Sequence, residues 1–103
     1  MYDEQLQSLD ISVLVNNVGV PGAINTAFFD MSEQGVHDVT TCNLYANVLL
    51  THQVVKTFKK RFEEGGKRSA IFFTSAMASL APVPNLGIYA ASKIATDFVA
   101  WGL

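Results

Sequence analysis

The sequence predicts an α/β fold in which two parallel strands alternate with two helices. Two short runs, residues 11–15 and 69–74, are rich in β-branched and aromatic side chains and have the length of strands. Each run is followed by a longer stretch whose apolar residues recur at helical spacing. Such alternation is typical of parallel strands joined by crossover helices, and the nearly continuous apolar strands predict a sheet covered on both faces.

The composition limits what the chain can be. Its 103 residues, 50% of them hydrophobic, allow one domain at most, and the net charge of −2 gives no reason to expect nucleic acid or an anionic membrane as a partner. The single cysteine, Cys42, excludes an internal disulfide, and neither His37 nor His52 has a partner at a metal-binding spacing, so no metal site is predicted. No apolar run approaches the roughly 18 residues of a membrane span, and the polar N-terminus does not resemble a signal peptide. A reducing, aqueous compartment is therefore expected.

The first part of the chain contains a connector, a strand and a long loop. Residues 1–10 are polar and predict the end of a helix or a connector. The strand at residues 11–15 is stopped by two asparagines and a glycine, which favour a turn. The loop that follows runs to about Met31.

A long helix is predicted next. Ser32 has the character of an N-cap, the helical pattern holds from residue 36 to residue 62, and the glycines at residues 65–66 end it. Lysine and arginine near its C-terminal end suit the helix dipole and predict a solvated helix end. One apolar stripe follows the helical spacing and consists of Leu44, Val48, Val55, Phe58 and Phe62.

The second strand, residues 69–74, leads through a loop with two prolines and a glycine to a helix that opens at Tyr89 and is still running at Trp101. Two strands and two helices cannot cover both faces of their own sheet. The chain therefore needs neighbours, either more of the same polypeptide or another copy.

Tyr89 and Lys93 are the residue pair that most strongly indicates chemistry. Four positions apart on a helix, they lie one turn apart on the same face, so the phenol and the ammonium can serve one site. A phenol normally loses its proton near pH 10, and a nearby cation favours the phenolate, which is how a tyrosine becomes a general acid or base. The alternative is a plain helix start with a half-buried tyrosine and a solvated lysine.

Four groups of residues occur in one order along the chain: Asn16-Asn17-Val18-Gly19 after the first strand, Asn43 in the long helix, Ser75 at the end of the second strand, and the pair Tyr89 and Lys93. Two of the groups lie just past the carboxyl ends of strands, where open parallel sheets bind ligands. In this order and spacing, from about Asp10 onward, the chain resembles the short-chain dehydrogenase/reductase family. The NNVG form of the first group and the Pro-x-Pro before the tyrosine resemble the branch of 3-oxoacyl-CoA reductases and 17β-hydroxysteroid dehydrogenases.

The resemblance implies that residues 1–103 are part of a doubly wound, Rossmann-type domain. Tyr89 would exchange a proton with the substrate oxygen, and Lys93 would favour its phenolate and hydrogen-bond the nicotinamide ribose. Ser75 would orient the substrate oxygen, and Asn43 would hold a water that links Lys93 to solvent. The residues that would pack beside the adenosine half of the cofactor are Asn16, Asn17, Val18 and Gly19.

Each assignment has a structural alternative. Asn43 would then be a buried helical amide bonded to the backbone, and the asparagines after the first strand would be turn residues, with Gly19 supplying a positive φ. Ser75 would be a strand-end serine; it stands fourteen residues before Tyr89, one more than the family's usual spacing, and Thr74 and Ser79 compete with it.

The resemblance also implies a cofactor and partners. These are NADP or NAD, with NADPH favoured, a small carbonyl or alcohol substrate, and a homodimer or homotetramer formed through the two helices. The apolar loop at residues 77–86 points to a lipophilic substrate. The expected location is the cytoplasm, or the cytosolic face of the endoplasmic reticulum where an N-terminal anchor precedes the chain.

Two other functions remain open. The family's glycine-rich phosphate loop is not among these residues, so the chain alone is expected to bind nucleotide poorly and to be inactive. That favours a non-catalytic, truncated module acting in dimerisation or assembly. A member acting on sugars, or as an epimerase, is the third possibility, and the asparagine, serine, tyrosine and lysine set fits a reductase better.

Overall fold

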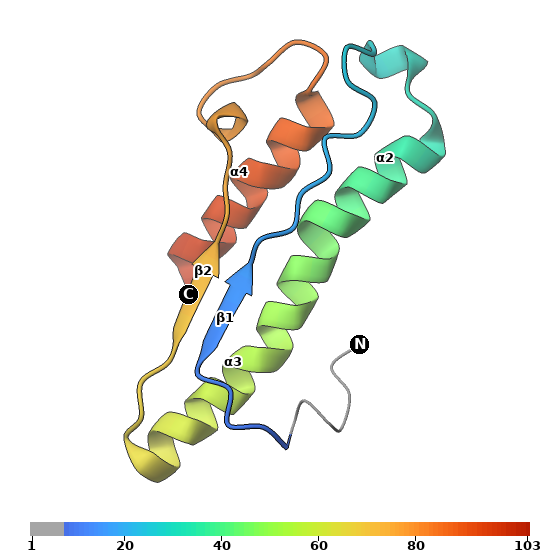
Figure 1. Cartoon of the computed structure of the whole chain (residues 1–103). Helices are drawn as coiled ribbons and strands as arrows, with labels where there is room; N and C mark the ends of the chain where they lie inside the picture. The colour runs from blue at the N-terminus through green and yellow to red at the C-terminus, as the bar shows by residue number, and fades with distance from the viewer. Residues whose placement is uncertain (1–7) are drawn as a thin grey trace.

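The computed structural model describes residues 8–103, so most of the predicted N-terminal connector lies outside the described residues. The predicted order of strand, helix, strand and helix is confirmed, with the long helix divided in two (Figure 1). In chain order the elements are β1 (Val13–Asn16), α2 (Glu33–Thr40), α3 (Ala46–Gly65), β2 (Ala70–Phe73) and α4 (Gly87–Gly102). Short 3₁₀ turns at Phe28–Asp30 and Met77–Ser79 lie in the two long loops.

The two strands pair in parallel, as the alternation of elements predicts. Val13 is opposite Ala70 and Asn16 is opposite Phe73. One further ladder bond, from Thr74 N–H to Asn16 O at 2.9 Å, extends the pairing past the carboxyl end of β2. The chain therefore leaves both strands at the same end of the sheet, the end formed by their carboxyl termini.

The predicted caps of the long helix are confirmed. The Ser32 hydroxyl accepts the Gly35 N–H at 3.1 Å, and Gly66 ends α3 in the left-handed region at φ 63°, with its N–H bonded to Phe62 O. Between α2 and α3 the long helix contains a π turn at Thr41–Tyr45, which the sequence pattern did not predict. Such single π turns are frequent at functional sites.

The residues buried on the inner face of the long helix differ from those of the predicted apolar stripe. Of the stripe, Phe58 is buried, Phe62 is exposed, and the other three residues are half-buried. The buried residues of α3 itself are Asn47, Thr51, Val54 and Phe58. The predicted stripe was wrong in part because two polar side chains are buried on this face: Thr51 accepts a hydrogen bond from Asn16 of β1, and Asn47 donates to the main chain of Asn43.

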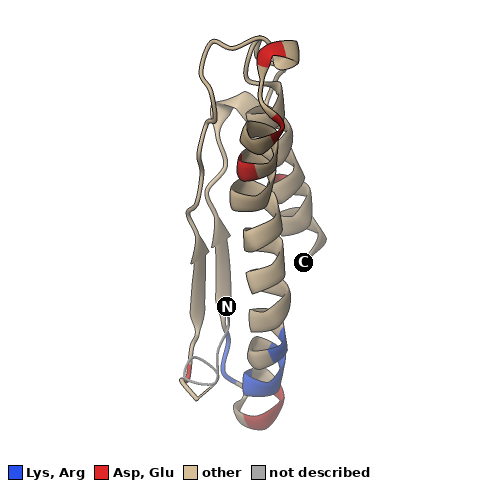
Figure 2. Cartoon of the chain, turned by 90° about the vertical axis from the view of Figure 1, so that its right-hand side faces the viewer, with Lys and Arg blue, Asp and Glu red and all other residues tan. Residues whose placement is uncertain are grey.

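Helices cover only one face of the sheet. Figure 2 shows the strands in one layer and the helices in a second layer beside them. On the other face Val13, Val15 and Phe72 are 51%, 58% and 57% exposed. Parallel sheets are normally buried on both faces. Within the described residues, the expectation that this sheet needs further cover is therefore met.

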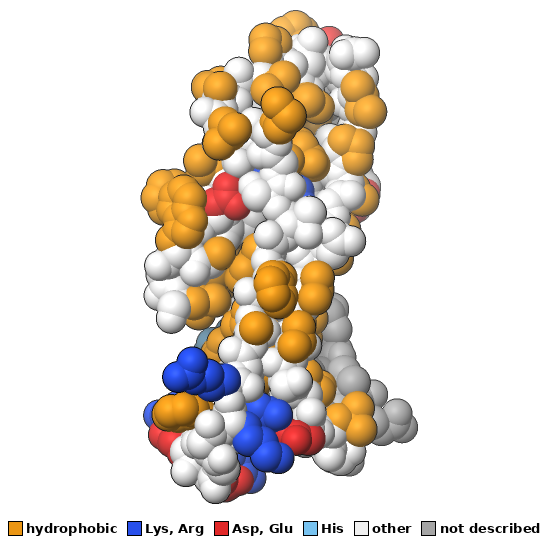
Figure 3. All heavy atoms as spheres, turned by 60° about the vertical axis from the view of Figure 1, so that its left-hand side comes forward, with side chains coloured by type: hydrophobic (Ala, Val, Ile, Leu, Met, Phe, Trp, Pro, Cys, Tyr) orange, Lys and Arg blue, Asp and Glu red, His pale blue; other side chains and the backbone are white. Residues whose placement is uncertain are grey.

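Charged residues gather where α3 ends (Figures 2 and 3). Arg61 Nε donates to Asp10 Oδ1 at 2.7 Å, and Lys67 Nζ lies 3.4 Å from Asp10 Oδ2. The hydrogen bond from Arg61 holds the pKa of the Asp10 carboxyl below its usual range. These pairs join the chain before β1 to the chain before β2.

α4 begins at Gly87, two residues earlier than predicted. Asn85 just before it has a positive φ of 61°, a conformation that asparagine tolerates better than most residues. The helix buries Ala90, Lys93 and Thr96 against the rest of the chain. Within residues 8–103, no helix has both the length and the apolar character that crossing a bilayer requires.

Candidate active site

Lys93 joins the carboxyl ends of both strands. Its Nζ donates to Val18 O at 2.9 Å and to Thr74 O at 3.0 Å, and the residue is 4% exposed. The alternative expectation of a solvated lysine is therefore wrong. A buried ammonium is costly unless its donors are bonded, and these two carbonyls provide such bonds.

Tyr89 lies one helical turn before Lys93 and is half-buried. The Lys93 Nζ is 5.9 Å from the centroid of the tyrosine ring. The structure thus brings the predicted acid–base pair together at the edge where the two strands end. An ammonium has three N–H donors, so Lys93 has one left beyond its two carbonyl partners.

Gly19 is needed for space next to this lysine. A Cβ at Gly19 would lie 2.9 Å from Lys93 Nζ and 3.2 Å from its Cε. The expectation of a positive φ at Gly19 is wrong, since the described glycines in that region are Gly22 and Gly66. Close approach, not backbone conformation, is the physical reason for a glycine here.

The mutation Gly19→Ala should lower activity more than stability. The added methyl group would push the Lys93 ammonium off its two carbonyls, and we expect kcat/KM to fall by about tenfold or more. Steady-state kinetics and thermal melting of the intact protein would measure both effects. Gly102→Ala is the control, because a Cβ at Gly102 meets nothing within 4 Å and the residue lies at the other end of α4 from Tyr89. Equal kinetics in the two variants would contradict this assignment.

Asn43 is fully buried in the π turn and connects three segments. Its Oδ1 accepts Val20 N–H at 2.8 Å, and its Nδ2 donates to Val20 O at 2.9 Å and to Ser92 Oγ at 3.0 Å. Ser92 in turn donates to Tyr89 O at 2.7 Å. Both N–H donors of the side chain are used, so a relay water could only donate to Asn43 and could not accept from its side chain.

The asparagines after β1 are divided between the interior and the surface. Asn16 is 3% exposed, and its Nδ2 donates to Thr51 Oγ1 on α3 at 2.8 Å. Its Oδ1 is buried and has no partner among the described residues. Asn17, Val18 and Gly19 are exposed along the edge where the strands end. These three exposed residues were predicted to pack beside a nucleotide, and they lie at the end of the sheet next to Lys93.

Ser75 lies two residues past β2, and the hydrogen-bond partners of its hydroxyl are side chains other than those of Tyr89 and Lys93. It donates to Asp97 Oδ2 at 2.8 Å and lies 3.0 Å from Ser79 Oγ. Asp97 is eight residues after Tyr89, which is about 12 Å along a helix axis. The structure therefore connects Ser75 to Asp97 and does not connect it to the acid–base pair.

Sequence reasoning missed several of these contacts. Asn47, Thr51 and Ser92 carry no local signal, because their partners lie in other elements or on the main chain. Asp97 did carry a signal: it continues the spacing of Tyr89 and Lys93 by one more turn on the same helix face. Its partner Ser75 could not be found from spacing alone.

A cavity of about 450 Å³ lies beside Tyr89, between the loop after β1 and the loop before α4. Apolar side chains dominate its lining. They include Phe28, Phe29, Met31, Val83, Leu86 and Ile88. The loop before α4 was predicted to contact substrate, whereas the contribution of the loop after β1 was not predicted.

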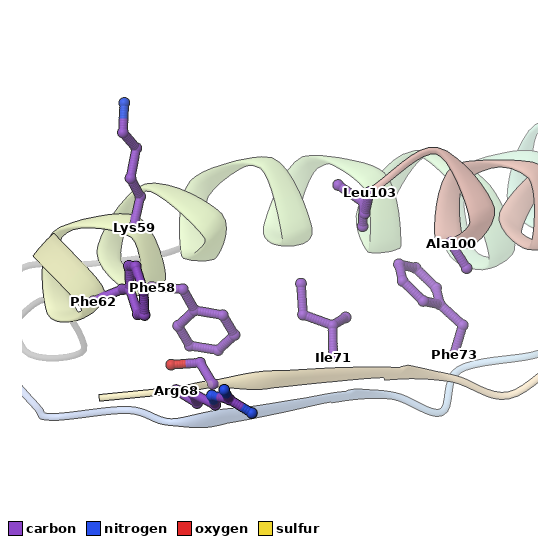
Figure 4. Close-up of a pocket in the computed structure, with 9 residues that line it drawn as sticks. Phe58, Lys59, Phe62, Arg68, Ile71, Phe73, Ala100 and Leu103 are labelled. Atoms are coloured by element: carbon purple, nitrogen blue, oxygen red, sulfur yellow. The ribbon is translucent and has the colours of Figure 1, made fainter. Parts of the chain in front are cut away.

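A second hollow, of about 520 Å³, lies between α3, β2 and the end of α4 (Figure 4). Phe58, Ile71 and Phe73 line it, and it contains none of the predicted site residues. The described residues also hold no group of three or more side chains that could bind a metal ion together.

Fold and site define a class of protein: a Rossmann-like parallel α/β unit with a tyrosine–lysine pair where its strands end. The chain belongs to the short chain dehydrogenase family, whose sequence model matches residues 2–100. The family resemblance of the sequence is thereby confirmed.

Named relatives agree with the branch that the sequence resembles. The chain is 34% identical to a very-long-chain 3-oxoacyl-CoA reductase of Laccaria bicolor, over 85% of this chain and 25% of that protein. It is 32% identical to 17-beta-hydroxysteroid dehydrogenase type 3 of Danio rerio, over 97% of this chain and 32% of that protein. It is also 34% identical to inactive hydroxysteroid dehydrogenase-like protein 1 of Pongo abelii, over 91% and 27%. The chain thus spans about a quarter to a third of the length of these relatives.

Solved structures confirm the fold. An NADH-dependent reductase, A1-R', complexed with NAD superposes with a TM-score of 0.79 at 22% identity, over 89% of this chain and 38% of that chain. A short-chain dehydrogenase from Sphingobium yanoikuyae in complex with NADPH superposes with a TM-score of 0.74 at 26% identity, over 96% and 37%. The predicted fold class, a fragment of a Rossmann-type α/β fold, is therefore correct.

Proposed function

We propose that the intact protein is an NAD(P)-dependent oxidoreductase that interconverts a carbonyl and an alcohol, with Tyr89 and Lys93 as its acid–base pair. The observation that carries the proposal is the buried Lys93 ammonium, held by two strand-end carbonyls one turn from Tyr89. A structural lysine would not need to be buried next to a phenol at the open edge of a parallel sheet.

In the direction of reduction, the Tyr89 phenol donates its proton to the substrate oxygen as the carbonyl carbon receives a hydride; oxidation reverses both transfers. When bound, the nicotinamide supplies or accepts that hydride. The remaining N–H donor of Lys93 would bind a ribose hydroxyl of the cofactor, and the same ammonium lies 5.9 Å from the centroid of the Tyr89 ring. Ser75 holds the substrate oxygen in this proposal, and its hydrogen has to turn away from Asp97 to do so.

The substrate we propose is lipophilic, of the 3-oxoacyl or steroid kind. The apolar cavity beside Tyr89 and the names of two relatives support this substrate class. NAD and NADPH are each bound by one structural neighbour, so either nicotinamide suits the fold, and we favour NADPH as the partner. We place the protein in the cytoplasm, or on the cytosolic face of the endoplasmic reticulum where an anchor precedes the chain.

A second candidate is a non-catalytic module that acts through its surfaces. One relative is named an inactive hydroxysteroid dehydrogenase-like protein, which favours this reading. Phe98 and Trp101 stack edge to face on α4 with their rings 5.2 Å apart, and they are 64% and 72% exposed. This aromatic pair would suit a homodimer or homotetramer formed through the helices.

A direct assay separates the two candidates. The intact protein would be mixed with NADPH or NADH and with a long-chain 3-oxoacyl-CoA, a keto steroid or a small polar ketone, and the loss of absorbance at the nicotinamide band recorded. We expect turnover with a lipophilic ketone and a kcat/KM at least about tenfold above that for the polar one, because apolar area is buried in the cavity. Cofactor binding without turnover of any ketone would favour the non-catalytic module.

A further inference from the structure

Asn47 is a buried amide on the inner face of α3. It is 5% exposed and lies one turn after Asn43. Asparagine is a poor helix former, and a buried amide costs free energy unless it is hydrogen-bonded. An apolar residue would fill this position at lower cost if packing were its only task.

The Asn47 side chain contacts the π turn. Its Nδ2 donates to the main-chain oxygen of Asn43 at 2.8 Å. In the same turn Ala46 N–H bonds to Thr41 O, five residues back, which is the irregular spacing of a π turn. The amide of Asn47 therefore holds the backbone of the residue whose side chain binds Val20 and Ser92.

These bonds form one path to the acid–base pair. It runs from Asn47 to the Asn43 backbone, from the Asn43 side chain to Val20 and Ser92, and from Ser92 to the Tyr89 carbonyl. Val20 directly follows Gly19, where an added Cβ would lie 2.9 Å from Lys93 Nζ. A shift of the π turn would thus move both the loop beside the lysine and the first turn of α4.

We propose that Asn47 is a positioning residue: its amide fixes the π turn, so that Asn43 sets the placement of the Val18–Val20 loop and of Tyr89. The catalytic part of this inference rests on the proposed function. The positioning part concerns only the chain's own hydrogen bonds, and it can be measured without turnover.

Threonine and valine at position 47 form a matched pair of variants. A threonine hydroxyl can donate to the carbonyl four residues back, as Thr40 does to Val36 O at 2.9 Å in α2. Valine has the same shape and no donor. Asn47→Thr should therefore keep the bond to Asn43 and Asn47→Val should lose it, while both remove the asparagine.

Amide hydrogen exchange at Val20 reports the position of Asn43, because the Val20 N–H is bonded to Asn43 Oδ1. We expect exchange at Val20 to be at least about fivefold faster in Asn47→Val than in the wild type or in Asn47→Thr. The Thr74 N–H, bonded to Asn16 O in the sheet, should exchange equally in all three proteins. Equal exchange at Val20 in both variants would overturn the proposal, and so would equal acceleration at Val20 and Thr74, which would indicate general loosening.

Kinetics of the intact protein provide the second readout. We expect kcat to fall about tenfold in Asn47→Val with little change in KM, and Asn47→Thr to recover most of the loss. Fast Val20 exchange with wild-type kcat would overturn the link to Tyr89.

If Asn47→Val does not fold, Asn47→Ala replaces it in the same comparison with Asn47→Thr. An inactive wild type would count against the proposed function, whereas the exchange data would still decide whether Asn47 positions the loop.

Discussion

Replacing Tyr89 with phenylalanine is expected to lower kcat/KM of the intact protein by about a thousandfold or more and to leave its fold intact. The substitution removes one oxygen from a half-buried ring, so the packing of α4 is retained. It also removes the proton donor and acceptor that the proposed chemistry needs, and such groups contribute roughly 10² to 10⁴ in rate. Steady-state kinetics in both directions and thermal melting would measure the two effects separately.

Tyr45→Phe is the matched control for this prediction. Tyr45 lies in the π turn and is 63% exposed, so its loss removes a phenol of the same protein without touching the site. We expect wild-type kinetics for this variant. Activity of Tyr89→Phe within tenfold of the wild type would rule out Tyr89 as the acid or base, and equal losses in both variants would indicate a nonspecific effect.

The two ends of the long helix could be predicted because they depend on neighbouring residues. The Ser32 hydroxyl reaches Gly35, and Gly66 reaches Phe62, so each cap is decided within about one turn. The parallel pairing of the strands followed from the alternation of strands and helices, since parallel strands need a crossover connection and that connection is usually a helix. The uncovered face of the sheet could be predicted because two helices are too few to cover both faces of a parallel sheet.

The inner face of α3 could not be predicted, because distant partners decide it. Thr51 is buried by its bond to Asn16, 35 residues earlier, and a polar residue carries no mark of such a partner. A periodicity argument assigns polar side chains to the solvent side, so it selected Phe62 and passed over Thr51. Buried polar contacts between elements are the part of this fold that local patterns do not contain.

The candidate site was predictable in its residue types and less so in its geometry. Spacing along a helix placed Tyr89 beside Lys93, and the cation lies 5.9 Å from the ring centroid. The structural alternative for Gly19, a positive φ, is wrong, and the contact with Lys93 could not be predicted because that side chain is more than seventy residues later. The place of Ser75 at a strand end predicts a serine that orients substrate, whereas the hydrogen bond from its hydroxyl to Asp97 carries no local signal in the sequence.

The mutation Lys93→Met should cost more in activity than in stability. Methionine has nearly the same length but no donor, so the carbonyls of Val18 and Thr74 lose their bonds. Both residues lie at an exposed edge where water can replace the ammonium, and the ammonium itself is costly to bury. We therefore expect the free energy of unfolding to fall by only about 1–2 kcal/mol, measured by urea titration.

Activity of Lys93→Met should fall by about a hundredfold or more, because no ammonium then lies beside the Tyr89 ring and none remains to bind a ribose hydroxyl. The KM for the nicotinamide should rise as well, which Tyr89→Phe is not expected to cause. Lys56→Met, at an exposed position on α3, is the control and should leave both quantities unchanged. A different result would be a large loss of stability in Lys93→Met, with normal turnover for the fraction that is folded. The lysine would then act only as a tether between the strand ends and α4. A folded variant with lost turnover would mean that the same buried ammonium that joins these elements also serves the chemistry.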